Sequence, residues 1–287
     1  MAKYKNIEAH WDCVTADTKL GHLVMFVKEI GILAQECEKK VKVIVYRANK
    51  EQQTWIKEVL NLLSVQSVIL FSENAYEEGS VAAWNWPGVA ELGGQLASWS
   101  GSTLWLQSAV IKYPNWPKFR SLMCIPYNCR DLDWSKSVAV HLKNHPSDVK
   151  SNANQDAWLS LFGAALADAP EYQFLLIGDD KFEAGTLPEN VRPAGNTLGE
   201  YFSVLERSAA FMGMASGFCI YALLENKPCR VWKHATHHAK HMERELGESG
   251  RFAFAGNRQK FFRSEDAATS LKNEFKALRV EMQAEAQ

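Results

Sequence analysis

Short apolar runs alternate with amphipathic stretches along most of the chain. In the first third, residues 41–46 (VKVIVY) and 68–71 (VILF) have the continuous apolar character of strands buried in a parallel sheet. The stretch between them has a helical period, so the three segments predict a βαβ unit with a right-handed crossover. An earlier helix is expected after Asp17 or Thr18, either of which can cap it. Its apolar positions recur at helical spacing: Leu20, Leu23, Val27, Ile30, Ala34 and Cys37.

The periodicity lapses around residues 125–134 and then restarts. Strands are expected at residues 137–142, 174–178, 210–212 and 229–232. Helices are expected at residues 154–167, from a Thr197–Glu200 capping box to about Arg207, and from Ser264 onward. We therefore predict two α/β domains. Their boundaries are 1–125 for the first domain, 126–135 for a linker, 136–263 for the second domain and 264–287 for a C-terminal helix.

Composition narrows the class of protein without indicating one function. The 287 residues are 47% hydrophobic and 23% charged, which suffices for two domains of ordinary size and excludes a disordered chain. A net charge of -1 provides no basic field for nucleic acid. No apolar run approaches the ~20 residues of a membrane span, and residues 1–12 lack the apolar core of a signal peptide. Six cysteines without a CxxC pair indicate reduced thiols, so we expect a cytoplasmic protein.

The segment 211–228 (FMGMASGFCIYALLENKP) is the strongest sign of chemistry in the sequence. A short apolar run leads through a Gly/Ser turn into a helix that ends at residues 226–228. The first N–H groups of a helix lack internal partners and carry the positive end of its dipole, so such a turn binds phosphate. The segment therefore predicts a ligand that contains a nucleotide diphosphate.

Other candidate ligand contacts follow the remaining strands of the second domain. Open α/β sheets bind ligands at the carboxyl ends of their strands, so these loops should meet at one edge. Lys143 can neutralise a diphosphate held at Ser216 and Gly217; the alternative is a solvated lysine beside glycines that only make turns. The candidate donor- and phosphate-binding residues are His141, Lys143, Asn144, Gly178, Asp179, Gly195, Gly213, Ala215, Ser216, Gly217 and Phe218.

Four segments, in this order, resemble the GT-B glycosyltransferases, and distantly the bacterial heptosyltransferases and fucosyltransferases. They are VAVHLKN at 138–144, the 158–180 segment with FLLIGDD at its end, the 191–213 segment with FMG at its end, and ASGFCIYALLENKP at 215–228. The resemblance implies an α/β protein of two Rossmann-like domains that face a cleft, with a C-terminal helix that can cross back to the first domain. It also implies a nucleotide-sugar donor in the second domain, an acceptor in the first, and transfer without a metal or other cofactor.

The resemblance assigns roles to particular residues and also shows departures. It makes Lys143 the basic residue at the diphosphate and places Asp179 or Gly195 near the nucleoside. Heptosyltransferases carry Asp-Thr-Gly where this chain has residues 215–217 (ASG), and a histidine where it has Ile220. The segment HLKN also lacks the arginine motif of fucosyltransferases. The base and the sugar of the donor are therefore left open.

An inverting transfer needs a base that takes the proton from the acceptor hydroxyl. The resemblance places this base in the first loop of the N-terminal domain, which is residues 13–22 here. Asp17 is the first candidate and His22 is the second. The structural alternatives are that Asp17 only caps the following helix and that His22 only occupies its first turn.

Two further clusters have both a functional and a structural interpretation. On a helix, His234, His238 and His241 would share one face and offer a metal site, but without a neighbouring carboxylate or cysteine we expect no metal. We expect instead that one of His234, His237 and His238 lines the cleft. The tryptophans within residues 84–116 suit either a sugar-binding wall or a buried core.

These observations favour a glycosyltransferase that moves a sugar from a nucleotide-sugar donor to a glycan or a lipid-linked acceptor, with an inverting mechanism. Nucleic acid is not expected as a partner and no transmembrane segment is expected, whereas peripheral membrane contact and the oligomeric state are left open. Two alternatives share the fold. One is a nucleotide-sugar epimerase, and the other is a protein that binds a nucleotide or a sugar without catalysis.

Overall fold

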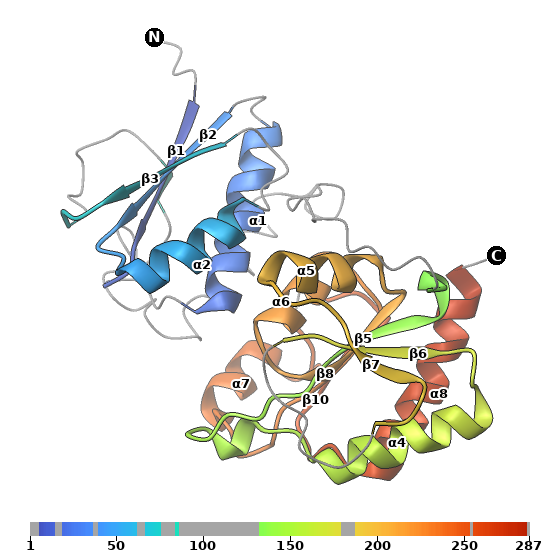
Figure 1. Cartoon of the computed structure of the whole chain (residues 1–287). Helices are drawn as coiled ribbons and strands as arrows, with labels where there is room; N and C mark the ends of the chain where they lie inside the picture. The colour runs from blue at the N-terminus through green and yellow to red at the C-terminus, as the bar shows by residue number, and fades with distance from the viewer. Residues whose placement is uncertain are drawn as a thin grey trace. The chain divides into compact units, whose positions relative to one another are not determined.

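The computed structural model describes residues 6–14, 19–36, 40–61, 67–75, 84–85, 132–178, 187–252 and 255–285. The chain divides into two compact units, Met1–Met123 and Cys124–Gln287, each built around its own parallel sheet (Figure 1). Among the described residues, no helix has both the length and the apolar character needed to cross a bilayer.

The N-terminal unit contains a four-stranded sheet in the order β3-β2-β1-β4. All of its strand pairs are parallel. The predicted βαβ unit is confirmed as β2, α2 and β3, whereas β1 was not expected from the sequence. The elements are β1 (Asn6–Asp12), α1 (Leu20–Glu36), β2 (Lys40–Tyr46), α2 (Lys50–Leu60), β3 (Ser67–Ser72) and β4 (Trp84–Asn85).

The two helices of this unit bury different amounts of surface. In α1, five consecutive residues, 23–27, have no exposed surface, so this helix is buried on more than one face. In α2, only Ile56, Val59 and Leu60 are buried, which is the pattern of a helix with one face on the core. Asn49 caps α2 through a reciprocal pair of hydrogen bonds with Gln52, at 2.8 and 2.9 Å.

The C-terminal unit contains a six-stranded, all-parallel sheet in the order β10-β9-β8-β5-β6-β7. Strands β8, β9 and β10 follow one another outward from β5 in one direction, and β6 and β7 in the other, which is the doubly wound arrangement. The strands are β5 (Ser137–His141), β6 (Gln173–Leu176), β7 (Val191–Pro193), β8 (Ala210–Met214), β9 (Cys229–Trp232) and β10 (Gln259–Phe262). The helices are α4 (Gln155–Asp168), α5 (Leu198–Arg207), α6 (Gly217–Leu224), α7 (Ala239–Leu246) and α8 (Ala268–Glu285).

The last helix, α8, belongs to the core of the C-terminal unit. It packs beside α4, and its apolar face, including Phe275 and Leu278, joins one cluster with Trp158 and Phe162 (Figure 1). The face that the sequence offered for bracing the first domain is therefore used here, against α4. The expected start at Ser264 is also wrong, because α8 begins at Ala268.

A fully buried arginine ties α8 to the sheet. Arg230 of β9 has no exposed surface, and its guanidinium donates to Glu274 at 2.8 Å and to Glu281 at 2.6 Å, both on α8. It also donates to the carbonyl oxygen of Arg258 at 2.8 Å. Because each donor has an anionic or carbonyl partner, this buried charge is a structural clamp and not a binding group.

Candidate functional site

The candidate site lies at the carboxyl edge of the C-terminal sheet, between β5 and β8. These neighbouring strands mark the point where the strand order reverses, and ligands of doubly wound sheets bind outside such a point. Their last residues face each other, with His141 of β5 opposite Gly213 of β8. A Cβ atom on Gly213, which has a φ of +158°, would lie 2.4 Å from the carbonyl oxygen of His141. Gly213 is therefore required for the two strands to approach, whether or not it contacts a ligand.

The helix α6 begins directly at this edge, as expected from the sequence. Ser216 is its N-cap residue, and the backbone N–H of Ser216 donates to Sγ of Cys219 at 3.3 Å. Burial raises the pKa of the Cys219 thiol to about 11, and the charges of Lys233 and Lys143 act against this shift. The thiol is therefore neutral, and two ammonium groups act on the first turn of α6.

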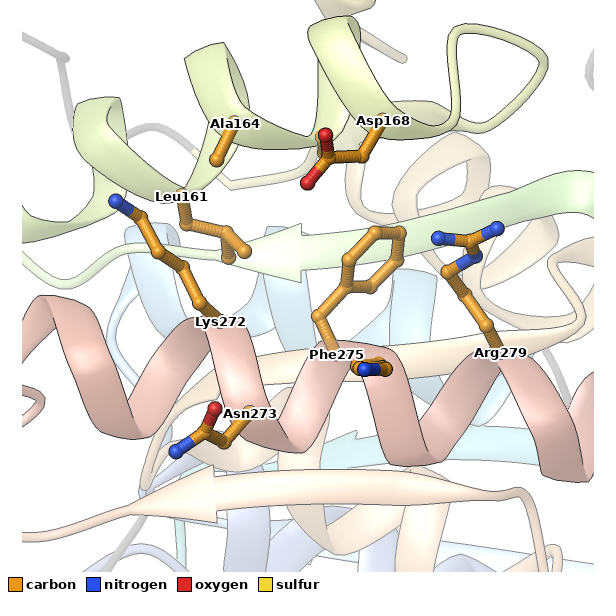
Figure 2. Close-up of a pocket in the computed structure, with 9 residues that line it drawn as sticks. Leu161, Ala164, Asp168, Lys272, Asn273, Phe275 and Arg279 are labelled. Atoms are coloured by element: carbon orange, nitrogen blue, oxygen red, sulfur yellow. The ribbon is translucent and has the colours of Figure 1, made fainter.

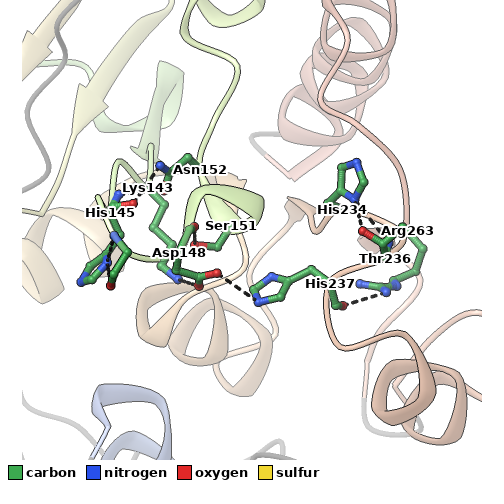
Figure 3. A network of polar contacts seen from close by, with 10 residues as sticks. Lys143, His145, Asp148, Ser151, Asn152, His234, Thr236, His237 and Arg263 are labelled. Carbon is green, nitrogen blue, oxygen red and sulfur yellow. Dashed lines mark hydrogen bonds and ion pairs between the residues drawn. The ribbon is translucent and has the colours of Figure 1, made fainter.

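Lys143 lies in the loop after β5 and faces a carboxylate. Its Nζ is 3.4 Å from Oδ2 of Asp148, and Oδ1 of Asp148 is 3.5 Å from Nε2 of His237, so that Asp148 lies between the two (Figure 3). Burial alone would raise the pKa of Asp148, but a hydrogen bond with Ser151 and the charges of His237 and Lys143 bring it below its usual value. Asp148 is therefore an anion that lies between this lysine and this histidine.

Lys233 was missed by the sequence analysis and is the most unusual charge at this edge. It directly follows β9 and is only 8% exposed. Within the part of the chain that the structure describes, its ammonium group has no hydrogen bond and no ion pair. Burial, as the largest cause, lowers the pKa of Lys233 to about 8; Lys143 and Arg263 add to this shift, whereas Cys219 and Asp148 oppose it. A buried cation beside a second cation is costly unless an anion joins them.

The loop that follows Lys233 is held in shape by Arg263. The Arg263 guanidinium donates to the carbonyl oxygen of His237 at 2.9 Å (Figure 3). It also donates to the carbonyl oxygen of Ala235 at 2.5 Å. Since the carbonyl groups of a turn are fixed in this way, the side chains on the turn are held in place as well. The chain returns to a helix only at Ala239, after His238 in the left-handed conformation with a φ of +54°.

The histidine cluster does not form the helical face that its spacing suggested. His234 and His238 precede α7, and only His241 lies on it, so the three do not lie on one helix. His234 instead hydrogen-bonds to Thr236 at 2.9 Å and lies 3.4 Å from Glu265. No group of metal-ligand side chains was found among the residues with described placement.

His237 is the histidine that points toward Asp148. It is 8% exposed, and within the described part of the chain its Nδ1 atom is buried without a hydrogen-bond partner. Burial, followed by the charges of Lys233 and His238, lowers the pKa of His237 to about 4, so the ring is neutral near pH 7. The expectation that one histidine of this cluster contributes to a ligand site therefore applies best to His237.

The other predicted site residues lie at the same edge but have packing roles. A Cβ atom on Gly178, where φ is +94°, would be 2.7 Å from the His141 ring, and one on Gly195, where φ is +88°, would be 2.9 Å from the Tyr201 ring. The His141 ring also packs against Phe218, with ring centres 4.9 Å apart. The structural interpretation is therefore sufficient for these two glycines. Asn144 lies half-buried in the loop after β5. The backbone N–H of Ala215 donates to the carbonyl oxygen of Trp232. Asp179 lies outside the described residues.

The structure does not test the two candidate bases of the N-terminal unit. Asp17 lies outside the described residues, and His22 is buried at 1% exposure in the first turn of α1. Both therefore stay predictions. Of the tryptophans between residues 84 and 116, only the backbone of Trp84 is described, so their role as a sugar-binding wall also stays untested.

The structure shows another acid in this unit, at the end of β1. Asp12 is 1% exposed and accepts hydrogen bonds from Nε and Nη2 of Arg47, at 3.0 and 2.7 Å, and from the N–H of Val14 at 3.0 Å. Arg47 has a left-handed backbone, with a φ of +52°. No local pattern predicts this ion pair, because its two members are 35 residues apart.

Comparison with known proteins identifies the fold. No protein family model and no curated protein sequence matches the chain. Among solved structures, the ADP-heptose lipopolysaccharide heptosyltransferase II of E. coli is similar over 98% of this chain and 100% of its own, with 9% identity and a TM-score of 0.56. The dodecameric iron-containing glycosyltransferase TibC of enterotoxigenic E. coli H10407 is similar over 99% of this chain and 77% of its own, with 9% identity and a TM-score of 0.53.

A third structure supports the same assignment. The E. coli heptosyltransferase WaaC with ADP-2-deoxy-2-fluoro heptose is similar over 96% of this chain and 99% of its own, with 12% identity and a TM-score of 0.51. The chain therefore has the α/β fold of GT-B glycosyltransferases, with a distant likeness to the heptosyltransferases. This confirms the fold class predicted from the sequence.

Proposed function

We propose that this chain is a glycosyltransferase that moves a sugar from a nucleotide-sugar donor to a glycan or lipid-linked acceptor. The observation that carries this proposal is the pair of lysines, Lys143 and Lys233, whose charges act on the first turn of α6 at the β5/β8 edge. Solved structures with the same fold include TibC in complex with ADP-D-beta-D-heptose and WaaC with an ADP-heptose analogue. A sugar joined to a nucleoside diphosphate would supply negative charge for both lysines, only one of which pairs with Asp148.

The charges suit the group that leaves in such a transfer. As the acceptor oxygen bonds to the anomeric carbon, the bond from that carbon to the diphosphate breaks, and its electron pair stays on the nucleoside diphosphate. Lys143, Lys233 and the N-terminus of α6, which has about +0.5 of a charge, would stabilise this developing negative charge. In the proposal these groups take the part that a metal ion plays in other transferases.

The diphosphate would compete with Asp148 for Lys143. Asp148 and Lys143 are both partly exposed, at 39% and 26%, and 3.4 Å apart, so their ion pair is weak and can exchange for a ligand phosphate. His237, which is neutral and has a buried Nδ1 atom, is a hydrogen-bonding group for the same ligand. We assign Asp17 as the base that takes the proton from the acceptor hydroxyl, with His22 as the second candidate. Attack by that hydroxyl on the anomeric carbon would give an inverting transfer.

Calorimetry with ADP, UDP, GDP and CMP, alone and as their sugar forms, tests the donor site. One of these nucleotides should bind, and Lys143→Ala and Lys233→Met should each weaken that binding about tenfold or more. Lys240→Ala, which removes an exposed lysine on α7, is the matched control and should bind like the native chain. Unchanged affinity in both site variants would refute the proposed diphosphate site.

Product analysis with the nucleotide sugar that binds separates the possible reactions. A transferase releases nucleoside diphosphate and forms a glycoside only when an acceptor is added. An epimerase of this fold would convert the sugar without an acceptor, and a non-catalytic binding protein would show affinity without turnover. Asp17→Asn should lower turnover and leave nucleotide affinity nearly intact.

A further inference from the structure

The carboxylate of Asp148 connects two loops whose strands lie on either side of β8. Asp148 belongs to the loop after β5 and His237 to the turn after β9, and β8 lies between these two strands in the sheet. The atoms that meet are Oδ1 of Asp148 and Nε2 of His237, 3.5 Å apart (Figure 3). The contact therefore joins the loops that flank the strand from which the chain enters α6.

The backbone of the loop after β5 is held without the Asp148 carboxylate. The N–H and the hydroxyl of Ser151 donate to the carbonyl oxygen of Asp148, at 2.9 and 2.7 Å. The side chain of Asn152 accepts from the N–H of His145 at 2.7 Å and donates to its carbonyl oxygen at 3.0 Å. Because these bonds use main-chain groups, a variant without the charge of Asp148 should keep the conformation of this loop.

The Asp148 carboxylate occupies the place of a ligand anion. Among the described residues, it is the one carboxylate within ion-pair distance of Lys143 and also the one near the His237 ring. Its charge also acts on the buried Lys233. The side chains of Asp148 and Lys143 are 39% and 26% exposed, so both can be reached from solvent. A phosphate that approaches Lys143 therefore meets a negative charge already beside it.

We propose that Asp148 is an intramolecular competitor of the ligand diphosphate. Its carboxylate contacts Lys143 and His237 while the site is empty, the diphosphate displaces it on binding, and it returns to Lys143 as the nucleoside diphosphate leaves. Two like charges at one ammonium group repel each other, so both anions cannot contact Lys143 without a loss of affinity. The inference rests on the proposed function, and it gives Asp148 control over affinity and product release.

The variant Asp148→Asn tests the competition by the sign of its effect. It removes the charge and keeps the shape, so inorganic pyrophosphate and any of ADP, UDP and GDP that binds should bind at least about fivefold more tightly. This factor corresponds to the loss of one partly exposed ion pair. Calorimetry measures the affinities, and a melting temperature close to that of the native chain shows that the variant is folded. Unchanged or weaker binding would overturn the proposal, since a carboxylate that contacts the ligand favourably gives a loss.

A double-mutant cycle with Lys143 shows whether the competition is for this lysine. In the Lys143→Ala background, the gain from Asp148→Asn should fall to about twofold or less, because the group for which the anions compete is absent. A gain that stays at fivefold would mean that Asp148 repels the ligand from a distance and would overturn the exchange at Lys143.

Asp168 provides the matched control. It is an exposed carboxylate on α4 that lines a cavity with Lys272 and Arg279 of α8, as Figure 2 shows. Asp168→Asn therefore makes the same chemical change beside another group of cations, and none of the residues that line this cavity belongs to the network of Figure 3. Its affinity for each probe should stay within about twofold of the native value. An equal gain in this variant would show an effect of net charge alone and overturn the role of Asp148.

The use of pyrophosphate separates this inference from the proposed function. Tighter pyrophosphate binding by Asp148→Asn, with no nucleotide bound by either chain, would support the competition and refute the nucleotide donor. Nucleotide binding that is equal in the two chains would support the donor site and overturn the competition. If none of the probes bound to either chain, both proposals would be wrong.

Discussion

Both sheets have charged residues at the carboxyl ends of their strands, but these charges are paired in the N-terminal unit and in excess in the C-terminal unit. In both units the first strand of the sheet lies beside the fourth, and each polar group of interest follows the carboxyl end of a strand. In the N-terminal unit, the buried Asp12 is matched by Arg47 through two side-chain nitrogens. In the C-terminal unit, Lys143 pairs with Asp148 and Lys233 has no ion-pair partner among the described residues, which leaves an excess of positive charge beside the start of α6. A balanced pair holds a fold together, whereas an unbalanced one indicates a ligand.

Breaking the balanced pair should have the largest effect on stability. Arg47→Ala leaves Asp12 as a buried anion at 1% exposure, so we expect a loss of about 3 kcal/mol in the free energy of unfolding. Adding Asp12→Asn should recover part of this loss, because the uncompensated charge is then gone. Urea unfolding of the full chain measures both variants. A loss below about 1 kcal/mol for Arg47→Ala would show that the pair is not the anchor described here.

Removing a charge from the C-terminal edge should raise stability instead of lowering it. Lys233→Met removes a buried cation and keeps a side chain of similar length, so the unfolding free energy should rise by about 1–2 kcal/mol. The same variant should weaken nucleotide binding, as expected of a group kept for function at the expense of stability. Thermal unfolding and calorimetry on one preparation test the two effects together. A loss of stability on this substitution would mean that Lys233 has a structural partner and would remove it from the donor site.

The same contrast explains how far the sequence could predict this protein. Strands β2 and β5 were found because each is mostly apolar, and α5 was found from its Thr197 cap. Strands β1 and β10 were missed because polar side chains interrupt them. Those side chains are satisfied by distant partners: Asp12 by Arg47, and Gln259, the first residue of β10, by the carbonyl oxygens of Ala222 and Leu223. A residue pattern cannot show a partner that is 36 residues away.

The candidate site was predicted in its location but not in all of its residues. The rule that ligands meet the carboxyl ends of parallel strands led to Lys143 and to the start of α6, and it applies equally to Lys233 after β9. Lys233 was overlooked because it adjoins a conspicuous run of histidines. The helical spacing of those histidines was misleading, because the turn at residues 233–238 is set by Arg263 from another segment. Burial of Lys233 is a tertiary property that no local pattern contains.

The smallest expected effect is a dependence on pH, which distinguishes Lys233 from the Asp12–Arg47 pair most directly. The pKa of Lys233 is about 8 in the folded chain against an ordinary value of 10.5, so between these values the unfolded chain binds more protons. Stability should therefore rise by about 1 kcal/mol between about pH 7 and about pH 9, while nucleotide affinity falls as the free site loses its cation. Lys233→Met should lack both trends, and Arg47→Ala should keep them. Melting temperatures and dissociation constants at about pH 7 and about pH 9 measure this, and parallel changes in stability and affinity would contradict the assignment of Lys233 to the donor site.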